Sequence, residues 1–244
     1  MSSDASWLGQ AGLLFNPKPK LGIVALPTGH PVIVVDDVLA EPERVASWAV
    51  RQRLQPPGYP YPGLVSTAPD AMNARFADFF AQHARSRLGG RRTVSSTVRL
   101  SLVTTPPEEL SPNQWQCHRD ALIPDTNLFA ASVLYLFHDP ALGGTDFYVP
   151  RIPPREVDQL LEDGARMGAD EFAARHGVAR GYMTDSNHYF ERIARLPARW
   201  NRMILYDGAV FHSGAIGRPH DLSVDPARGR LTLNGFFVCS RLAR

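Results

Sequence analysis

Short runs of apolar, often β-branched residues dominate the second half of the chain. From Thr93 onward these runs are separated by turn residues, which is typical of strands. The runs are VSSTVRLSLVTT, LFAASVLYLF, GTDFYVPR, NRMILYDGAVFH and RGRLTLNGFFVCSR. Helical segments do not alternate regularly with them, so the pattern predicts an antiparallel sandwich or barrel rather than a doubly wound parallel sheet.

Helical spacing occurs in three places. Residues 39–54 follow a strand-like apolar run at 31–37, and residues 70–88 repeat apolar side chains at intervals of three and four. A third helical segment, residues 155–177, interrupts the later strands. We therefore expect a mainly β fold with flanking helices, in which an N-terminal helical layer packs against one face of the strands.

The organisation of the chain predicts a single domain over residues 1–244. Residues 1–30 form an irregular N-terminal extension, and residues 151–199 form a partly helical insert. An insert near the mouth of a barrel is a candidate substrate lid, and a surface ornament or an oligomer contact is the alternative. The oligomeric state stays open.

Composition and charge narrow the classes of partner. The chain is 44% hydrophobic and 20% charged with a formal net charge of +2, which indicates a globular protein without the positive field that nucleic acid binding needs. Cys117 and Cys239 lack metal-binding or disulfide-framework spacing, which favours a reducing cytoplasm. The N-terminus does not look like a signal peptide and no apolar stretch is long enough for a membrane span, so we expect a cytoplasmic protein without a membrane partner.

Two histidines and one aspartate form a candidate metal site. His118 and Asp120 in QCHRDALIPDTN are two residues apart, so on a strand their side chains would share a face, with Cys117 on the other. His212 ends the apolar run MILYDGAVF. Two imidazoles and a carboxylate make the facial triad of non-heme Fe(II) oxygenases, whereas a structural zinc site needs four ligands. Each histidine taken alone is more typical of a packed or solvated side chain.

A cation and a hydroxyl share one face of the last strand-like run, RGRLTLNGFF. Strand alternation puts Arg230, Thr232 and Asn234 on that face and the neighbouring leucines on the other. A planar guanidinium beside a hydroxyl would make a receptor for a carboxylate. An ordinary half-exposed strand has the same pattern, and the histidine and aspartate pattern is what favours the receptor.

The order of HxD, a distal histidine and RxT resembles the Fe(II)/2-oxoglutarate-dependent dioxygenases, and most closely their prolyl 4-hydroxylase-like branch. Residues 129–151, FAASVLYLFHDPALGGTDFYVPR, are similar to the strand, Gly-Gly turn and strand that follow HxD in that branch. Residues 205–217, LYDGAVFHSGAIG, resemble its distal-histidine segment, and PVIVVDDVLAEPERV resembles its opening strand and helix. The resemblance covers most of residues 31–241.

The resemblance implies a fold and a set of roles. His118, Asp120 and His212 would bind Fe(II), while Arg230 would pair with the far carboxylate of the co-substrate 2-oxoglutarate, with Thr232 assisting and O2 as the second co-substrate. The implied fold is a double-stranded β-helix, a jelly-roll or cupin-like barrel of antiparallel strands with helices on one side.

The chain departs from that branch in three respects. The insert lengthens the gap between His118 and His212, and the segment RPHDLSVDPARG lengthens the gap between His212 and Arg230, so Arg218 and Arg228 are alternative anchors. The tyrosine that often precedes HxD in this branch has no clear counterpart here.

The implied activity is hydroxylation, or a related oxidation such as desaturation, of an unactivated C–H bond in a small molecule, an amino acid or a peptide. Asp120 favours this outcome because halogenating members lack the carboxylate. Phe236 stands where nucleic acid demethylases of this superfamily carry a second arginine. The alternative is a non-catalytic or 2-oxoglutarate-independent cupin-like metal-binding module.

Polar aromatic residues in two loops are candidates for lining a substrate pocket, with simple packing as the alternative. They are Tyr59 and Tyr61 in QPPGYPYPG, and Tyr182, Asn187, His188 and Tyr189 in and before NHYFER.

Overall fold

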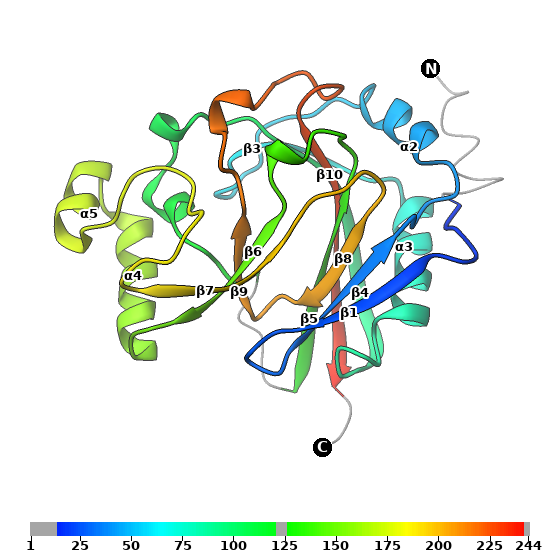
Figure 1. The fold of residues 1–244 in the computed structure, drawn as a ribbon, viewed down its shortest axis with the longest axis horizontal. Coiled ribbons are helices and arrows are strands. Elements are labelled where there is room, and N and C mark those ends of the chain that lie inside the picture. Colours follow the sequence, from blue (N-terminus) through cyan, green and yellow to red (C-terminus); the bar gives the residue numbers. More distant parts are fainter. Residues whose placement is uncertain (1–13, 121–125, 242–244) are drawn as a thin grey trace.

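The computed structural model describes residues 14–120 and 126–241, and this part of the chain is mainly β (Figure 1). Its strands pair antiparallel throughout and form a larger and a smaller sheet. The larger sheet has the order β1 (Lys20–Ala25), β2 (Pro31–Asp36), β8 (Met203–Asp207), β5 (Asn127–Tyr135), β10 (Arg230–Arg241), β4 (Gly90–Val103) and β3 (Gly63–Thr67). The smaller sheet has the order β7 (Phe190–Leu196), β6 (Thr145–Pro150) and β9 (Phe211–Gly214).

The chain crosses repeatedly between the two sheets. From β4 in the larger sheet it passes to an isolated bridge beside β9, returns to β5, and then enters β6 and β7 in the smaller sheet. It comes back in β8, crosses once more in β9 and ends in β10. Repeated crossing between two facing antiparallel sheets is the jelly-roll arrangement, and it confirms the expected double-stranded β-helix core.

Helices α2 (Pro42–Ala49) and α3 (Asp70–His83) form the expected N-terminal layer. Helix α3 packs against β4 and β10, and the ring of Phe80 stacks on that of Phe237 with centroids 4.1 Å apart. Trp48 of α2 is buried in the same cluster. Both helices are shorter than the sequence pattern predicted: α2 begins at Pro42, where a proline suits the first turn, and α3 ends at His83.

Two expectations about the strands need correction. Within the predicted irregular extension of residues 1–30, Lys20–Ala25 is strand β1; residues 1–13 lie outside the described part. All six β1 residues are exposed, so neither face of the strand is buried and backbone pairing to β2 holds it. The run NRMILYDGAVFH is not one strand, because a turn in which the Asp207 carboxylate accepts the Ala209 N–H separates β8 from β9.

The insert contains two helices rather than one, α4 (Pro154–Arg166) and α5 (Ala169–His176), followed by β7. Met167 has an extended backbone and interrupts the helical run. The two helices lie to one side of the smaller sheet, away from α2 and α3 (Figure 1). They pack around Trp115, Phe172 and Phe190 in a buried apolar cluster. In the described residues we find no helix long and apolar enough to cross a membrane.

Candidate active site

A cavity of about 720 Å³ lies between the two sheets. Arg230, Thr232 and Asn234, which alternate along β10, line it from the larger sheet, and His212 of β9 lines it from the smaller one. The insert closes part of its wall, with Leu160 among the contributing residues. A volume of this size is typical of a site for a small molecule.

His118 and His212 meet through the backbone although they are far apart in sequence. The N–H of His118 donates to the carbonyl of His212, and the N–H of His212 donates to the carbonyl of His118, each at 2.9 Å. This antiparallel bridge sets the two imidazoles side by side, with ring centroids 4.5 Å apart. The fold therefore brings together the two histidines that the sequence singled out.

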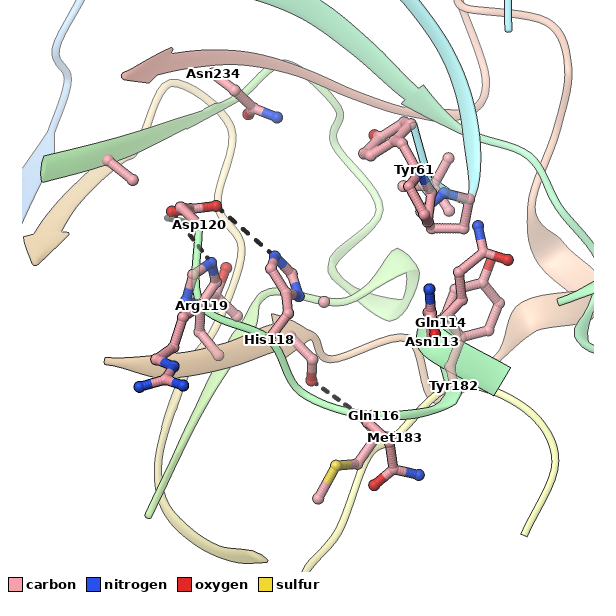
Figure 2. Close-up of a pocket in the computed structure, with 18 of the residues that line it drawn as sticks. Tyr61, Asn113, Gln114, Gln116, His118, Arg119, Asp120, Tyr182, Met183 and Asn234 are labelled. Carbon is pink, nitrogen blue, oxygen red and sulfur yellow. Dashed lines mark hydrogen bonds and ion pairs between the residues drawn. The ribbon is translucent and has the colours of Figure 1, made fainter. Parts of the chain in front are cut away.

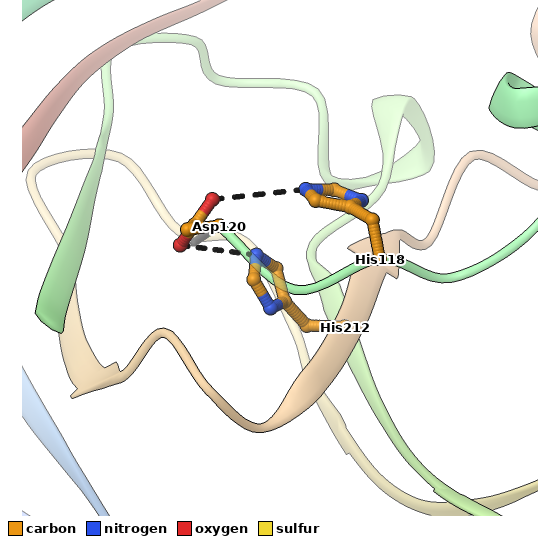
Figure 3. Close-up of side chains that lie close together, drawn as sticks. All are labelled: His118, Asp120 and His212. Atoms are coloured by element: carbon orange, nitrogen blue, oxygen red, sulfur yellow. Dashed lines mark ion pairs between the residues drawn. The ribbon is translucent and has the colours of Figure 1, made fainter. Parts of the chain in front are cut away.

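Asp120 completes the cluster. Its backbone N–H donates to the carbonyl of Gly208 at 3.0 Å, and its carboxylate points back to both histidines (Figure 3). Oδ1 lies 3.8 Å from Nε2 of His118, and Oδ2 lies 3.5 Å from Nε2 of His212. One ligand atom from each of the three residues lies within 4.8 Å of the others. Asp120 Oδ2 is buried without a hydrogen-bond partner in the described structure.

Gly208 leaves the space that the Asp120 carboxylate occupies. A Cβ atom at Gly208 would lie 2.9 Å from Asp120 Oδ2 and 3.0 Å from the Phe129 ring and carbonyl. The Gly208 N–H already donates to that Phe129 carbonyl at 2.7 Å. The position of Asp120 thus depends on glycine in the turn between β8 and β9.

Hydrogen bonding and charge prepare the three side chains to act as ligands. Nδ1 of His212 lies 2.8 Å from the carbonyl of Val210, which as an acceptor requires the proton on Nδ1 and leaves the Nε2 lone pair free. Burial favours a raised pKa for Asp120, but the two histidines outweigh it and the pKa is lowered. Burial by itself would lower the pKa of His212, but Asp120 and the Val210 carbonyl together outweigh burial and raise this pKa.

His118 lines the cavity and 54% of its side chain is exposed. Desolvation of the charged imidazole, followed by the charge of the neighbouring His212, lowers the pKa of His118 to about 4. The imidazole is therefore neutral and able to bind a metal. Cys117 points elsewhere, as predicted, and packs in the apolar cluster of the insert. Arg119 lies over the Phe211 ring and 3.6 Å from the Asp158 carboxylate.

Arg230 is a buried cation at another wall of the same cavity. Its Nε and one terminal nitrogen donate to the carbonyls of Gly143 and Gly144, at 3.0 and 2.7 Å. Only 6% of the residue is exposed, and no carboxylate of a described residue lies within ion-pairing distance of it. The close approach of the Gly143 backbone to Ala215 leaves no room for a side chain there, since a Cβ would lie 2.1 Å from the Ala215 carbonyl.

Thr232 is buried beside the cavity, with its hydroxyl 3.5 Å from the Ser101 carbonyl. The alternative anchors do not line the cavity: Arg218 pairs with Asp221 at 2.7 Å, and Arg228 is exposed. Arg230 and Thr232 are therefore the pair that reaches the cavity, and their role as a co-substrate anchor remains a prediction.

The loop residues divide into two groups. Tyr59, Tyr61 and Tyr182 line the cavity, whereas the other three candidates, Asn187, His188 and Tyr189, do not. The expectation for those three is corrected: the Asn187 side chain accepts the backbone N–H groups of Tyr189 and Phe190 and shapes the turn before β7.

Several cavity residues were missed in the sequence. Arg99 of β4 is the only charged side chain in the run VSSTVRLSLVTT, and that isolation is a signal that could have identified it. Tyr206 of β8 lies against His212 with ring centroids 4.8 Å apart, and burial raises its pKa so that it stays a neutral phenol. Tyr135 of β5 does not line the cavity itself but lies behind it, with its ring 6.0 Å from the Arg230 guanidinium and its hydroxyl 2.9 Å from that of Thr145. Tyrosines thus approach the site from strands other than the one expected.

Comparisons with known proteins give one family and several structural neighbours. The model of a family of unknown function, DUF6445, matches residues 17–237. No curated protein sequence matches the chain. HygX from Streptomyces hygroscopicus, solved with nickel and 2-oxoglutarate bound, has a TM-score of 0.48 and 14% identity, covering 86% of this chain and 82% of its own.

Two further solved structures have similar relations to this chain. The non-heme α-ketoglutarate-dependent epimerase SnoN from nogalamycin biosynthesis has a TM-score of 0.46 and 16% identity, covering 86% of this chain and 81% of its own. A prolyl-4-hydroxylase from Pseudomonas putida has a TM-score of 0.40 and 15% identity, covering 99% of this chain and 98% of its own. These neighbours come from the superfamily that the sequence resembles, but at such identities a function has to follow from the residues of this chain.

Proposed function

The chain belongs to DUF6445, a family of unknown function, and we propose that it is a non-heme Fe(II)/2-oxoglutarate-dependent oxygenase. Its reaction would be hydroxylation, or a related oxidation, of an unactivated C–H bond in a small molecule, an amino acid or a peptide. One observation carries the proposal: the cluster of His118, Asp120 and His212 shares a cavity with Arg230, a buried cation that has no carboxylate partner among the described residues.

The donor set fits a ferrous ion. Two imidazole nitrogens and one carboxylate oxygen would hold the ion, and because these side chains line the cavity, further ligands would come from that space. The unpartnered Oδ2 of Asp120 is a buried anionic atom that a cation would compensate. A structural zinc site would need a fourth protein ligand, and Cys117 belongs to another cluster.

Arg230 and Thr232 fit a dicarboxylic oxo acid. A buried guanidinium without a counter-charge is costly, so a carboxylate that enters the cavity would be held strongly. The carbonyls of Gly143 and Gly144 restrain two of its nitrogens and so fix the plane of the guanidinium. Together these contacts support 2-oxoglutarate, whose far carboxylate would lie against Arg230, as the co-substrate.

Fe(II) with 2-oxoglutarate and O2 would supply oxidative decarboxylation to succinate and CO2, coupled to oxidation of a substrate C–H bond. The residues of this chain would position the metal, orient the co-substrate and exclude water. Val210 holds the tautomer of His212, Asp120 supplies the negative charge, and Arg230 orients the co-substrate. We propose that the insert acts as a lid over the substrate, because Leu160 and its neighbours line the cavity with apolar surface and would limit water access.

The test is aerobic incubation of the protein with Fe(II) and 2-oxoglutarate, followed by measurement of succinate. We expect slow succinate formation that His118→Ala and Asp120→Ala both abolish. Persistent absence of succinate, with and without a broad panel of small molecules, would refute the proposal. Metal binding without affinity for 2-oxoglutarate would instead support a 2-oxoglutarate-independent metal-binding module.

A further inference from the structure

The cavity holds a second arginine that, like Arg230, has no carboxylate partner among the described residues. Arg99 of β4 has its guanidinium carbon 4.9 Å from the centre of the Tyr59 ring and 4.5 Å from that of Phe236. One terminal nitrogen donates to the hydroxyl of Tyr59, and Nε is buried with no acceptor among residues 14–120 and 126–241. None of the ion pairs in the described part of the chain involves Arg99. It is therefore a charged group held in place by aromatic rings, with hydrogen-bonding capacity left over.

The three arginines that line the cavity differ in their counter-charges. Arg119 has the carboxylate of Asp158 at 3.6 Å. Arg230 is matched by the far carboxylate of 2-oxoglutarate under the proposed function, and the metal would match Asp120. Arg99 is the cation that these assignments leave without an anion, so a further negative group is needed when the site is filled.

Arg99 lies at a different position along the cavity from Arg230. It pairs in register with Asn234, which is four residues beyond Arg230 on β10. At the usual rise of a strand, the two backbone positions are about 14 Å apart along the strand direction. On the Arg99 side, Phe236 contacts Phe129 with ring centroids 6.0 Å apart, and Phe129 lies beside Gly208 and Asp120.

Buried polar atoms without a partner among the described residues occur at separate places in the cavity lining. Asn113 Oδ1, Gln116 Nε2 and Asn234 Oδ1 are buried and have no hydrogen-bond partner among the described residues. Figure 2 shows these three residues around the pocket that also contains His118 and Asp120. Of the described residues with such an atom, Asn73 alone does not line the cavity. Buried polar atoms are normally satisfied, which indicates that the cavity takes a polar ligand; of the three, Asn234 is the residue in register with Arg99.

We propose that Arg99, between Tyr59 and Phe236, binds a carboxylate of the molecule that the site oxidises, so that the substrate is an organic acid. This inference rests on the proposed function and deepens it by naming the substrate class. The planar guanidinium suits a carboxylate, and the flanking rings restrain it to one orientation. The cavity of about 720 Å³ has room for such an acid beside the co-substrate.

The experiment compares acids with their neutral amides. Protein loaded with Ni(II) and 2-oxoglutarate is titrated calorimetrically with monocarboxylic acids, N-acetyl amino acids and tripeptides with free C-termini, each paired with its primary amide. We expect at least one acid of the panel to bind about tenfold or more tightly than its amide, because a charge-assisted pair replaces a neutral one. The three arms distinguish a free acid from an amino acid and from a peptide terminus.

The variants assign the preference to Arg99. Arg99→Gln should reduce the acid-to-amide ratio to about one, and Arg99→Lys should restore part of it as a point charge without the fork. Arg119→Gln is the matched control, because it removes a cavity-lining arginine whose charge is already paired, and it should keep the preference. Thermal melts of each variant establish that it is folded.

Three outcomes separate the possibilities. If no acid of the panel binds wild-type protein more tightly than its amide, the inference is wrong. If Arg99→Gln weakens binding of 2-oxoglutarate and leaves the acid preference intact, Arg99 serves the co-substrate and the inference is equally wrong. If an Arg99-dependent acid preference appears in protein that never forms succinate, the carboxylate site stands and the proposed oxygenase function fails.

Discussion

Gly208→Ala is expected to damage the candidate metal site without replacing any of its three proposed ligands. The added Cβ would lie 2.9 Å from Asp120 Oδ2 and 3.0 Å from the Phe129 ring, whereas ordinary contacts begin at 3.4 Å. Asp120 would thus have to move by about half an ångström. The backbone cannot easily retreat, because the Gly208 N–H donates to Phe129 at 2.7 Å and its carbonyl accepts the Asp120 N–H at 3.0 Å.

Displacing a ligand from its supporting contacts typically weakens metal affinity about 10–100-fold, and we expect a loss in that range. Overpacking should also lower the free energy of unfolding by about 1–3 kcal/mol. Calorimetric titration with Ni(II) measures the first effect and urea denaturation the second. Gly217→Ala is the matched control, since nothing lies within 4 Å of its added Cβ. Wild-type metal affinity in folded Gly208→Ala would refute the assignment of Asp120 as a ligand.

Three further predictions concern the ligands, the anchor and the core. His212→Ala should abolish Ni(II) binding by calorimetry, while His188→Ala, an exposed histidine outside the cavity, should leave it unchanged. Arg230→Gln should weaken 2-oxoglutarate binding to the Ni(II)-loaded protein about 10–100-fold, because a charge-assisted contact is lost. Unchanged affinity would show that a residue other than Arg230 binds the far carboxylate. Phe80→Ala removes the ring stacked on Phe237 and should cost about 3–5 kcal/mol in urea denaturation, and a loss below about 1 kcal/mol would contradict its place in the core.

Local pattern predicted the members of the candidate site but not how they meet. The spacing of His118 and Asp120 and the end of an apolar run at His212 were visible in the sequence, because ligand residues follow strand periodicity. Their convergence depends on the backbone bridge between His118 and His212 and on the turn at Gly208. Those contacts join distant segments, so no local window contains them.

Arg99 illustrates what periodicity misses. A charged residue in a strand reads as solvent-facing by default, and only the pairing of β4 with β10 turns it toward the cavity. The same limit applies to Asn187, which looked like a pocket residue by composition but shapes a turn with its own backbone neighbours. Composition indicates what a side chain can bind, whereas its neighbours decide what it does bind.

The sequence by itself determined most of the strand and helix segments, the presence of a helical insert and the chemical types available for a metal and a carboxylate, because apolar periodicity and turn residues act over a few positions. Tertiary structure decided the rest. The crossing of the chain between two sheets brought His118, Asp120 and His212 together, left Arg230 without a carboxylate partner in the described part of the chain, and placed β1 at an exposed edge. The physical reason is that burial and the satisfaction of polar groups depend on neighbours far apart in the chain.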